Sequence, residues 1–179
     1  EREIRMAERA RETGLPLLYA HLVGGQDELV FDGASFAVDA QGRIAARAAS
    51  FAEDSLVVDF DAAAVPSGRI EPVPAIEEQA WAALVTGVRD YVRKNGFPGA
   101  IIGLSGGVDS ALVLALAVDA LGADRVRTVM MPSPYTADIS WLDARDMAAR
   151  LGVRYEELPI APMFDAFRHA LAPQFEGLP

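Results

Sequence analysis

The stretch Gly103-Leu104-Ser105-Gly106-Gly107-Val108-Asp109-Ser110 decides the fold of the second half of this chain. A short apolar run, Ala100–Leu104, leads into it and is typical of a buried strand in a parallel sheet. The run that follows, Ala111–Leu121, is almost wholly apolar and rich in helix-forming residues. The sequence therefore predicts a strand that passes through this loop directly into a helix, as in parallel α/β proteins.

The residue types in this loop indicate a site for a polyphosphate. Gly106 and Gly107 permit positive φ and a close approach of the main chain to a ligand, which a side chain would block. Backbone N–H groups at the start of a helix attract anions, and the hydroxyls of Ser105 and Ser110 can donate to phosphate oxygens. Asp109 alone would repel phosphate, so its presence indicates a Mg²⁺ ion that bridges the carboxylate and the pyrophosphate. The alternative is a tight turn in which Asp109 or Ser110 caps the helix.

The loop resembles a known nucleotide-binding motif. It lacks the lysine of a Walker-type loop, but it matches Ser-Gly-Gly-x-Asp-Ser, the pyrophosphate loop of the ATP pyrophosphatases. Those enzymes adenylate a substrate and release pyrophosphate. The resemblance implies that Asp109 is the metal ligand and that the ATP-binding residues are Gly103, Leu104, Ser105, Gly106, Gly107, Val108, Asp109 and Ser110.

From residue 76 onward, helices and strands are expected to alternate. The clearest helix is amphipathic, with Ile76, Ala80, Leu84, Val88 and Val92 at helical spacing. The predicted helices cover 76–94, 111–121, 139–151 and 163–171, and the predicted strands cover 100–104, 126–131 and 154–158. This succession predicts a doubly wound parallel α/β domain whose ligand lies at the carboxyl ends of the strands.

The first part of the chain has a different organisation. A helix is expected over 2–13, strands over 17–23 and 55–60, a loop over 24–33, and a hairpin whose strands cover 35–38 and 44–48. Between residues 61 and 74 the periodicity fails and three prolines appear, which predicts a linker. We therefore expect a first domain over 1–62, a linker over 63–75 and a second domain over 76–179.

Composition restricts the class of protein. The chain has 179 residues, of which 51% are apolar, as in globular proteins. Its net charge of −10 and its single lysine, Lys94, argue against general binding to nucleic acid or to an anionic membrane. The longest apolar run, Ala111–Val118, is too short to span a bilayer, and the charged first residues lack a signal-peptide core. We expect a soluble cytoplasmic protein.

Further segments narrow the resemblance to one family. Leu15–Tyr19 followed by Val23–Gly33 is similar to the late part of a nitrilase-type glutaminase domain. Met131–Thr136 and the Ser140-x-x-Asp143-Ala144 motif are similar to segments that follow the pyrophosphate loop in a synthetase domain. Together they resemble the bacterial glutamine-dependent NAD⁺ synthetases over essentially the whole chain. The implied fold is the end of a nitrilase-like α/β sandwich followed by an adenine nucleotide alpha hydrolase-like domain.

The resemblance implies a ligase of NAD biosynthesis. The carboxylate of deamido-NAD⁺ would attack the α-phosphate of ATP with release of pyrophosphate, and ammonia from glutamine would then displace AMP to give NAD⁺. It also implies Mg²⁺ as cofactor, a homo-oligomeric assembly, and main chain around Met130 and Met131 against the adenine. From the residues alone, the favoured interpretation of both methionine side chains is a place in the core at a strand end.

The chain departs from this family in its lack of the glutaminase triad. The family's glutaminase uses a Glu-Lys-Cys triad, but this chain has no cysteine and Lys94 lies beyond the predicted linker. We therefore expect an internal portion of a longer polypeptide, which alone would not hydrolyse glutamine. The alternatives are another pyrophosphate-loop amidotransferase, such as a GMP synthetase, and a non-catalytic nucleotide-binding protein.

A few other residues have two interpretations each. Asp27, Glu28 and Asp32 could form a metal cluster, but hydrogen bonding within their loop is favoured. Tyr135 and Ser140 could line the nucleotide pocket or belong to a helix cap, and the sequence favours neither. Packing or surface roles are expected for the remaining aromatic and imidazole candidates, which are Trp81, Trp141, His21 and His169.

Overall fold

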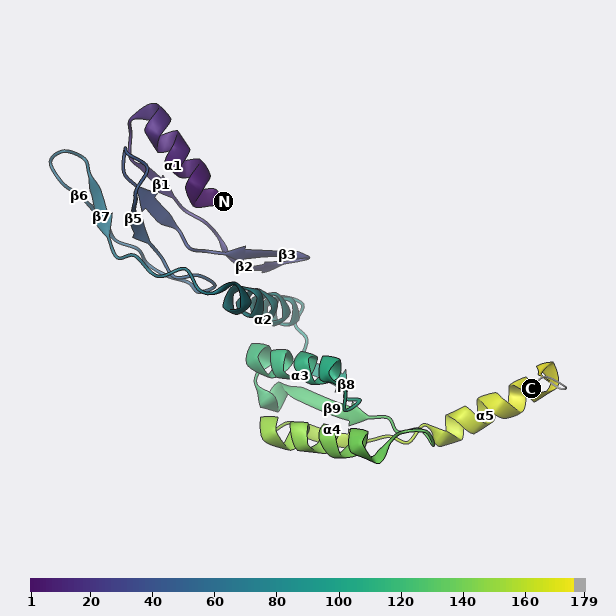
Figure 1. Cartoon of the computed structure of the whole chain (residues 1–179). Coiled ribbons are helices and arrows are strands. Elements are labelled where there is room, and N and C mark those ends of the chain that lie inside the picture. Colours follow the sequence, from purple (N-terminus) through teal and green to yellow (C-terminus); the bar gives the residue numbers. More distant parts are fainter. Residues whose placement is uncertain (176–179) are drawn as a thin grey trace. The chain divides into compact units, whose positions relative to one another are not determined.

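Residues 1–175 are described in the computed structural model of the protein, and they divide after Tyr91 into two units (Figure 1). The predicted second domain, 76–179, extends past the described residues at its end. Within the described residues, no helix is both long enough and apolar enough to cross a membrane.

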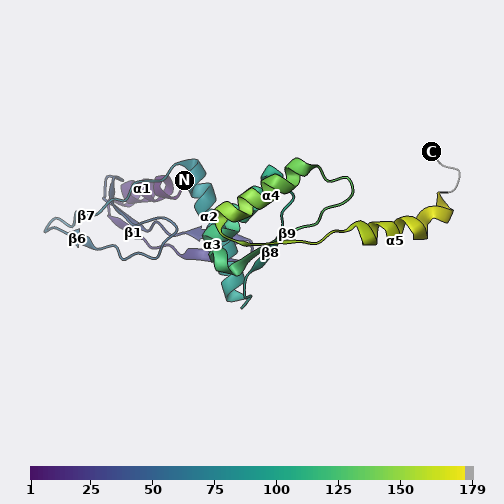
Figure 2. The same ribbon diagram turned by 90° about the horizontal axis from the view of Figure 1, so that it is seen from below.

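The first unit is built on a small antiparallel sheet. Strands β1 (Leu17–Tyr19), β4 (Phe36–Val38) and β5 (Ile44–Arg47) pair in the order β1-β4-β5. Helix α1 (Arg2–Thr13) has the predicted bounds and lies beside this sheet in both views (Figures 1 and 2). Its C-cap residue, Gly14, has a left-handed backbone. The core of this layer is formed by Ala10, Phe36 and Val38, against which Met6, Leu17, Tyr19 and Ile44 pack.

The turn between β4 and β5 confirms the predicted hairpin, and the structure shows why an aspartate, Asp39, stands in it. The buried side chain of Asp39 accepts hydrogen bonds from the backbone N–H groups of Gln41 and Arg43, both at 2.9 Å, and from Arg43 Nε at 2.7 Å. Burial acts to raise the pKa of Asp39, but the hydrogen bonds donated by Arg43 and Gln41 outweigh it. The pKa of Asp39 therefore lies below its ordinary value, and the ionised carboxylate stabilises the turn.

The predicted loop over residues 24–33 is wrong. This stretch forms a β-hairpin of strands β2 (Val23–Gln26) and β3 (Leu29–Asp32), with Asp27 at positive φ in its turn. The predicted strand over 17–23 is accordingly two strands, β1 and the start of β2. The glycines that suggested a loop allow close packing instead, because a side chain on Gly25 would meet the backbone of Gly87 at 3.1 Å.

Part of the predicted linker is paired. Strand β7 (Pro66–Gly68) forms an antiparallel hairpin with β6 (Val58–Phe60), which is shorter than the strand predicted over 55–60. An isolated bridge also joins Arg47 to Ile70. The sequence did not predict this strand because its residues are rich in proline and lack periodicity. Pro66 is compatible with the strand because it is the first residue, where no N–H is needed for the ladder. The limits of the linker stay a prediction.

The second unit contains the predicted parallel sheet. Helix α2 (Ile76–Lys94) leads into it, and strands β8 (Ala100–Gly103), β9 (Val126–Met130) and β10 (Arg154–Glu157) pair in parallel in the order β10-β9-β8. The connections are helices α3 (Val108–Leu121) and α4 (Asp138–Leu151), with a short 3₁₀ turn, η1 (Ala123–Arg125), before β9. The parallel α/β fold is confirmed.

The two faces of this sheet differ in exposure. Val126, Thr128 and Met130 are buried under α3 and α4, which contact each other as well as β9. Arg127, which lies between Val126 and Thr128, and its partner Ile101 on β8 are exposed. Two successive right-handed crossovers in one direction place both helices on the same face. The described residues thus contain one helical layer of the doubly wound fold.

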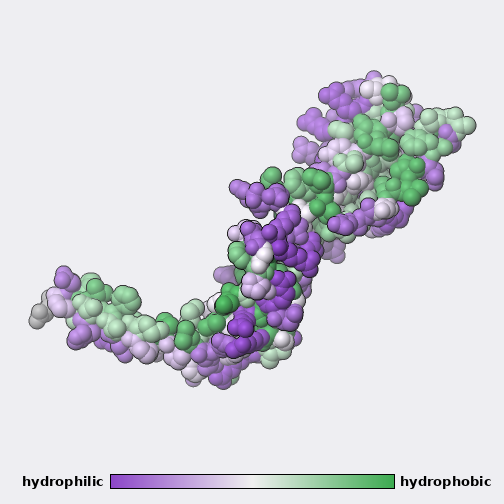
Figure 3. All heavy atoms as spheres, turned by 180° about the vertical axis from the view of Figure 1, so that it is seen from behind, coloured by the Kyte–Doolittle hydropathy of each residue, from purple (hydrophilic) through white to green (hydrophobic). Residues whose placement is uncertain are grey.

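The last described helix, α5 (Ala161–Leu171), is followed by the 3₁₀ turn η2 (Ala172–Gln174). It begins two residues before the predicted helix and has no buried residue. Its apolar side chains Met163, Phe167 and Leu171 are exposed. Figure 3 shows green, hydrophobic atoms along this end of the chain.

Candidate functional site

The loop that follows β8 begins inside the sheet. The Leu104 backbone N–H donates to Val129 O at 2.9 Å, which continues the pairing of β8 with β9, and the Leu104 side chain is 1% exposed. Of the predicted ATP-binding residues, Leu104 can therefore offer a ligand only its main chain. Its side chain anchors the start of the loop in the core.

Two serine hydroxyls hold the loop in its turn. The Ser110 hydroxyl donates to Gly107 O at 3.0 Å and accepts from the Ser105 backbone N–H at 3.2 Å. It also lies 3.0 Å from the Ser105 hydroxyl, which accepts from the Gly107 N–H at 3.3 Å. The sequence predicts these hydroxyls as phosphate donors, and the structure shows that they also shape the loop.

Helix α3 starts within the loop, three residues earlier than predicted. Its N-cap residue is Gly107, no side chain caps it, and Ala111 N–H makes the first helical hydrogen bond, to Gly107 O at 3.1 Å. The alternative in which Asp109 or Ser110 caps the helix is wrong, because both lie in its first turn. Among the described residues, the backbone N–H groups of Val108 and Asp109 have no acceptor. They are available to an anion.

The two glycines of the loop have different roles. Gly106 has φ +81°, and a Cβ placed on it would lie 2.3 Å from Ser140 O in the first turn of α4. Gly107 has φ −88°, and a Cβ there would only touch Ser105 Oγ at 3.5 Å. Gly106 therefore has the positive φ that glycine permits and Gly107 does not, whereas close approach of the main chain to a ligand stays a prediction. The close approach at Gly106 is to the protein's own helix α4.

A cavity of about 480 Å³ opens beside this loop at the carboxyl ends of β8 and β9. Its lining brings the predicted nucleotide-side segments together: Gly103, Leu104, Ser105, Val129, Met130, Met131, Tyr135, Thr136, Ala137 and Ser140. This edge of a parallel sheet is where α/β proteins bind ligands. A second cavity of about 380 Å³ is lined by Gly106, Gly107 and Val108 together with residues of α4.

The two methionines at the end of β9 have separate environments. Met130 is 4% exposed, as the core interpretation predicts, whereas Met131 is 50% exposed. The Met131 side chain lies against Gly103, since a Cβ on that glycine would be 3.3 Å from Met131 Cε. Met131 is thus the methionine whose side chain a ligand in the cavity can reach.

The segment between β9 and α4 is a turn that lines the cavity. Ser133 and Thr136 fold it through hydrogen bonds from Ser133 N–H to Thr136 Oγ1 at 2.9 Å and from Thr136 N–H to Ser133 O at 3.1 Å. Helix α4 is preceded by Ala137 and has no side-chain cap, so neither Tyr135 nor Ser140 is a capping residue. Tyr135 is 77% exposed, and its ring meets Phe164 edge-on at 5.8 Å.

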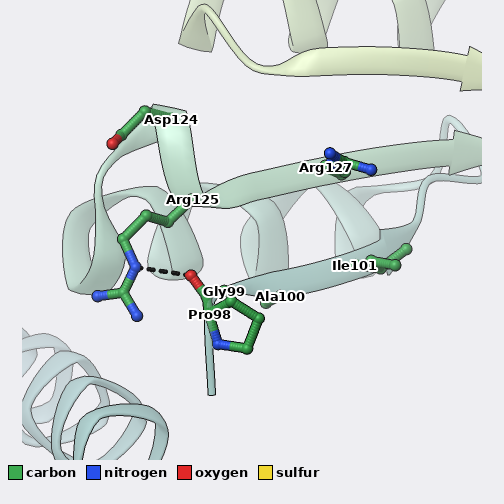
Figure 4. A pocket seen from close by; sticks show the side chains of 7 residues that line it. All are labelled: Pro98, Gly99, Ala100, Ile101, Asp124, Arg125 and Arg127. Carbon is green, nitrogen blue, oxygen red and sulfur yellow. Dashed lines mark hydrogen bonds between the residues drawn. The ribbon is translucent and has the colours of Figure 1, made fainter. Parts of the chain in front are cut away.

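A third cavity, of about 410 Å³, lies at the opposite ends of the strands (Figure 4). Pro98, Gly99, Asp124 and Arg125 line it, and Arg125 Nε donates to Pro98 O at 2.8 Å. Because ligands of parallel α/β folds bind at the carboxyl ends, we do not assign the nucleotide to this cavity.

The acids of the hairpin do not form a metal site. No group of three or more His, Cys, Asp or Glu side chains in the part of the chain that the structure describes could hold a metal ion. Asp32 is paired with Arg2 through both carboxylate oxygens, and His21 Nε2 lies 3.5 Å from it. Burial acts to raise the pKa of Asp32, but the hydrogen bonds and charge of Arg2 lower it below its ordinary value.

Sequence reasoning missed one charged cluster near the same sheet edge. Glu157, the last residue of β10, accepts hydrogen bonds from Arg145 at 2.6 and 2.8 Å and from the Tyr155 hydroxyl at 3.1 Å. The hydrogen bond from Arg145 lowers the pKa of Glu157. Burial raises the pKa of Tyr155, with its bond to Glu157 acting in the same direction. No motif marks these residues, and only the pairing of α4 with β10 brings them together.

The remaining candidates lie at packed or surface positions. Trp81 and Trp141 lie half-buried on α2 and α4, and Arg145 Cζ is 5.9 Å from the Trp141 ring. His21 packs between Tyr19 and Phe31, with ring centroids 5.7 and 5.8 Å apart. His169 is exposed on α5.

Comparisons with known proteins agree with this division of the chain. The NAD synthase family model matches residues 80–178, more than half of the chain, and the carbon-nitrogen hydrolase family model matches residues 1–69. The glutamine-dependent NAD(+) synthetase of Xylella fastidiosa (strain Temecula1) is 50% identical over 99% of this chain and 33% of its own length. That of Synechocystis is 42% identical over 99% of this chain and 32% of its own length.

A solved structure is similar over the same extent. The glutamine-dependent NAD⁺ synthetase from Acinetobacter baumannii, in complex with adenosine diphosphate, has a TM-score of 0.92 and 44% identity. The match covers 99% of this chain and 34% of that one. The chain therefore spans about a third of the length of the relatives that it matches.

Proposed function

The chain belongs to the NAD synthase family, and on this premise we propose that its protein catalyses the glutamine-dependent amidation of deamido-NAD⁺ to NAD⁺. The carboxylate oxygen of deamido-NAD⁺ attacks the α-phosphorus of ATP and pyrophosphate leaves. Ammonia then attacks the carbonyl carbon of the adenylate, and AMP leaves. The observation that carries the proposal is the Ser-Gly-Gly-x-Asp-Ser loop, which opens beside a cavity at the carboxyl edge of a parallel sheet.

The proposed role of the loop is to hold the phosphates of ATP. The N–H groups of Val108 and Asp109 would donate to phosphate oxygens, and the first turn of α3 would add the favourable end of its dipole. The hydroxyls of Ser105 and Ser110 are close enough to each other to turn toward the same ligand. In support, the similar Acinetobacter baumannii enzyme is in complex with adenosine diphosphate. The adenine is proposed to lie in the cavity beside Met130 and Met131.

Asp109 is the proposed Mg²⁺ ligand of this chain. Its carboxylate is exposed in the first turn of α3 and forms no ion pair or hydrogen bond with another described residue. Mg²⁺ at nucleotide sites is held by one or two carboxylates together with phosphates, so a single aspartate fits. When bound, the ion would neutralise phosphate charge during adenylation.

The first unit is proposed to serve the nitrogen supply. Residues 1–69 match the carbon-nitrogen hydrolase family, but these residues contain neither a lysine nor a cysteine. Glutamine hydrolysis is therefore assigned to the whole protein and not to the residues of this chain. A homo-oligomeric assembly and a cytoplasmic location stay predictions.

The proposal is tested with the full-length protein. Purified enzyme, deamido-NAD⁺ and MgATP are combined with glutamine or with ammonium chloride, and NAD⁺, AMP and pyrophosphate are quantified. We expect the three products in equal amounts with either nitrogen source. Turnover of xanthosine monophosphate in place of deamido-NAD⁺ would identify a GMP synthetase, and the absence of turnover with both substrates would support a non-catalytic nucleotide-binding protein.

A further inference from the structure

The hairpin β2–β3 contacts helix α2. The two elements lie in parts of the chain that match different family models. The hairpin, Val23–Asp32, lies within the residues matched by the carbon-nitrogen hydrolase model. Gly87 and Asp90 of α2 lie within the residues matched by the NAD synthase model. The contact forms inside the first structural unit, which includes α2 as far as Tyr91. It therefore joins the part proposed for nitrogen supply to the part proposed for ligation.

The packing at this contact is main chain on main chain. Gly25 is buried, and a Cβ placed on it would lie 3.1 Å from Gly87 Cα and 3.4 Å from Thr86 O. Gly24 has φ +129°, and a Cβ there would lie 2.8 Å from Asp90 Oδ2. No side chain fits between the hairpin and the helix at these positions. The register of the hairpin on α2 is consequently set by the two backbones.

One side chain ties the two backbones together. Asp90 Oδ2 accepts a hydrogen bond from the Gly25 N–H at 2.8 Å, and Asp90 Oδ1 lies 3.2 Å from Arg89 Nε. The Asp90 side chain is 18% exposed, so water competes weakly for the bond. Hydrogen bonds from N–H groups to carboxylates are stronger than those between neutral groups.

Along the chain, α2 is followed by β8 and then by the ATP loop. Asp90 lies one turn before the end of α2 at Lys94, and β8 begins at Ala100 and leads into the loop at Gly103. Within this short stretch, the Phe97 N–H donates to Val92 O at 3.0 Å and Gly96 N–H to Arg93 O at 3.1 Å. The chain that leaves α2 is thus held in a hydrogen-bonded turn before it enters β8.

We propose that Asp90 is a positioning residue that couples the two activities of the enzyme by holding hairpin β2–β3 on α2. This rests on the proposed function, because coupling has meaning only where glutamine supplies the nitrogen for NAD⁺. Asp90 lies outside the linings of the cavities beside the ATP loop. The ligation of free ammonia needs the loop but not the hairpin, so the two nitrogen sources separate positioning from general support of the fold.

The test uses Asp90→Ala and Asp90→Asn in the full-length enzyme, with Glu77→Ala as the matched control. Glu77 is an exposed acid near the start of the same helix. We measure NAD⁺ formation with glutamine and with ammonium chloride, together with glutamate released per NAD⁺ formed. For Asp90→Ala we expect about a tenfold loss with glutamine and a change within about twofold with ammonia, since one charge-assisted hydrogen bond is worth about one decade. More glutamate should be released per NAD⁺.

Asp90→Asn keeps a side-chain oxygen that can accept from Gly25, so its loss should fall between those of the wild type and Asp90→Ala. It also keeps the test decisive if the alanine variant does not fold. Equal losses with both nitrogen sources, or an unchanged glutamate-to-NAD⁺ ratio in both Asp90 variants, overturn the inference. If the wild-type enzyme forms no NAD⁺ from either source, the proposed function itself fails, which is a separate result.

Discussion

Replacing Gly106 by alanine should damage the ATP loop far more than the same change at Gly107. Gly106 has φ +81°, and left-handed backbone costs a residue with a Cβ about 1–2 kcal/mol. The new Cβ would also lie 2.3 Å from Ser140 O and 2.7 Å from Ser140 Cα, so the loop or α4 must shift. Overpacking of this kind costs about 1–3 kcal/mol. The expected loss of stability is the sum, about 2–5 kcal/mol.

The effect on ATP binding follows from the same displacement. A shifted loop would misplace the N–H groups of Val108 and Asp109, and hydrogen bonds to charged groups contribute about 1.5–3 kcal/mol each. Loss of both corresponds to at least about a 100-fold weaker affinity for MgATP. Gly107→Ala is the matched control for loop stability, because Gly107 has φ −88° and its Cβ would make an ordinary contact at 3.5 Å with Ser105 Oγ.

The assay combines urea unfolding with calorimetric titration of MgATP on both full-length variants. Gly107→Ala should change stability by less than about 1 kcal/mol, because alanine adopts this φ without strain. If the two variants show equal stability and equal affinity for MgATP, the close packing of Gly106 on α4 does not control the site and the reasoning is refuted.

Three further predictions concern other residues. Asp109→Asn should reduce NAD⁺ formation in the full-length enzyme by at least about tenfold with glutamine and with ammonia alike, because Mg²⁺ serves adenylation whatever the nitrogen source; wild-type turnover with ammonia would contradict the assignment. Ser110→Ala removes the hydroxyl that bonds Gly107 O and the Ser105 N–H, and it should weaken MgATP binding about tenfold in a calorimetric titration, whereas an unchanged affinity would show that the turn holds without it. Asp39→Ala should lower unfolding stability by about 1–3 kcal/mol at neutral pH. Because the pKa of Asp39 is lowered on folding, this contribution to stability is complete above about pH 4 and is lost as pH falls through the folded pKa. Chemical unfolding curves of the wild type and the variant should therefore converge in acid. A difference in stability that does not depend on pH would refute the role of the carboxylate.

Local patterns in the sequence were sufficient for most elements of the fold. The strand, loop and helix around Gly103–Ser110 could be predicted because apolar runs and backbone preferences act between near neighbours in the chain. The long helix Ile76–Lys94 and the hairpin around Asp39 were predictable for the same reason. The placement of Met131 and Ser140 beside the loop could also be predicted from the sequence, since successive parallel strands end at the same edge of a sheet.

Tertiary structure alone decided the features that depend on distant partners. Gly24 and Gly25 predicted a loop, yet they form part of a strand. The strand packs against Gly87 and is hydrogen-bonded to Asp90, and both partners lie more than 60 positions further along the chain. The two loop glycines were indistinguishable in sequence, but only Gly106 meets α4. Which of the adjacent methionines was exposed depended on how the helices cover β9. A glycine in the sequence indicates freedom of the backbone, and only the neighbour that packs against it determines how that freedom is used.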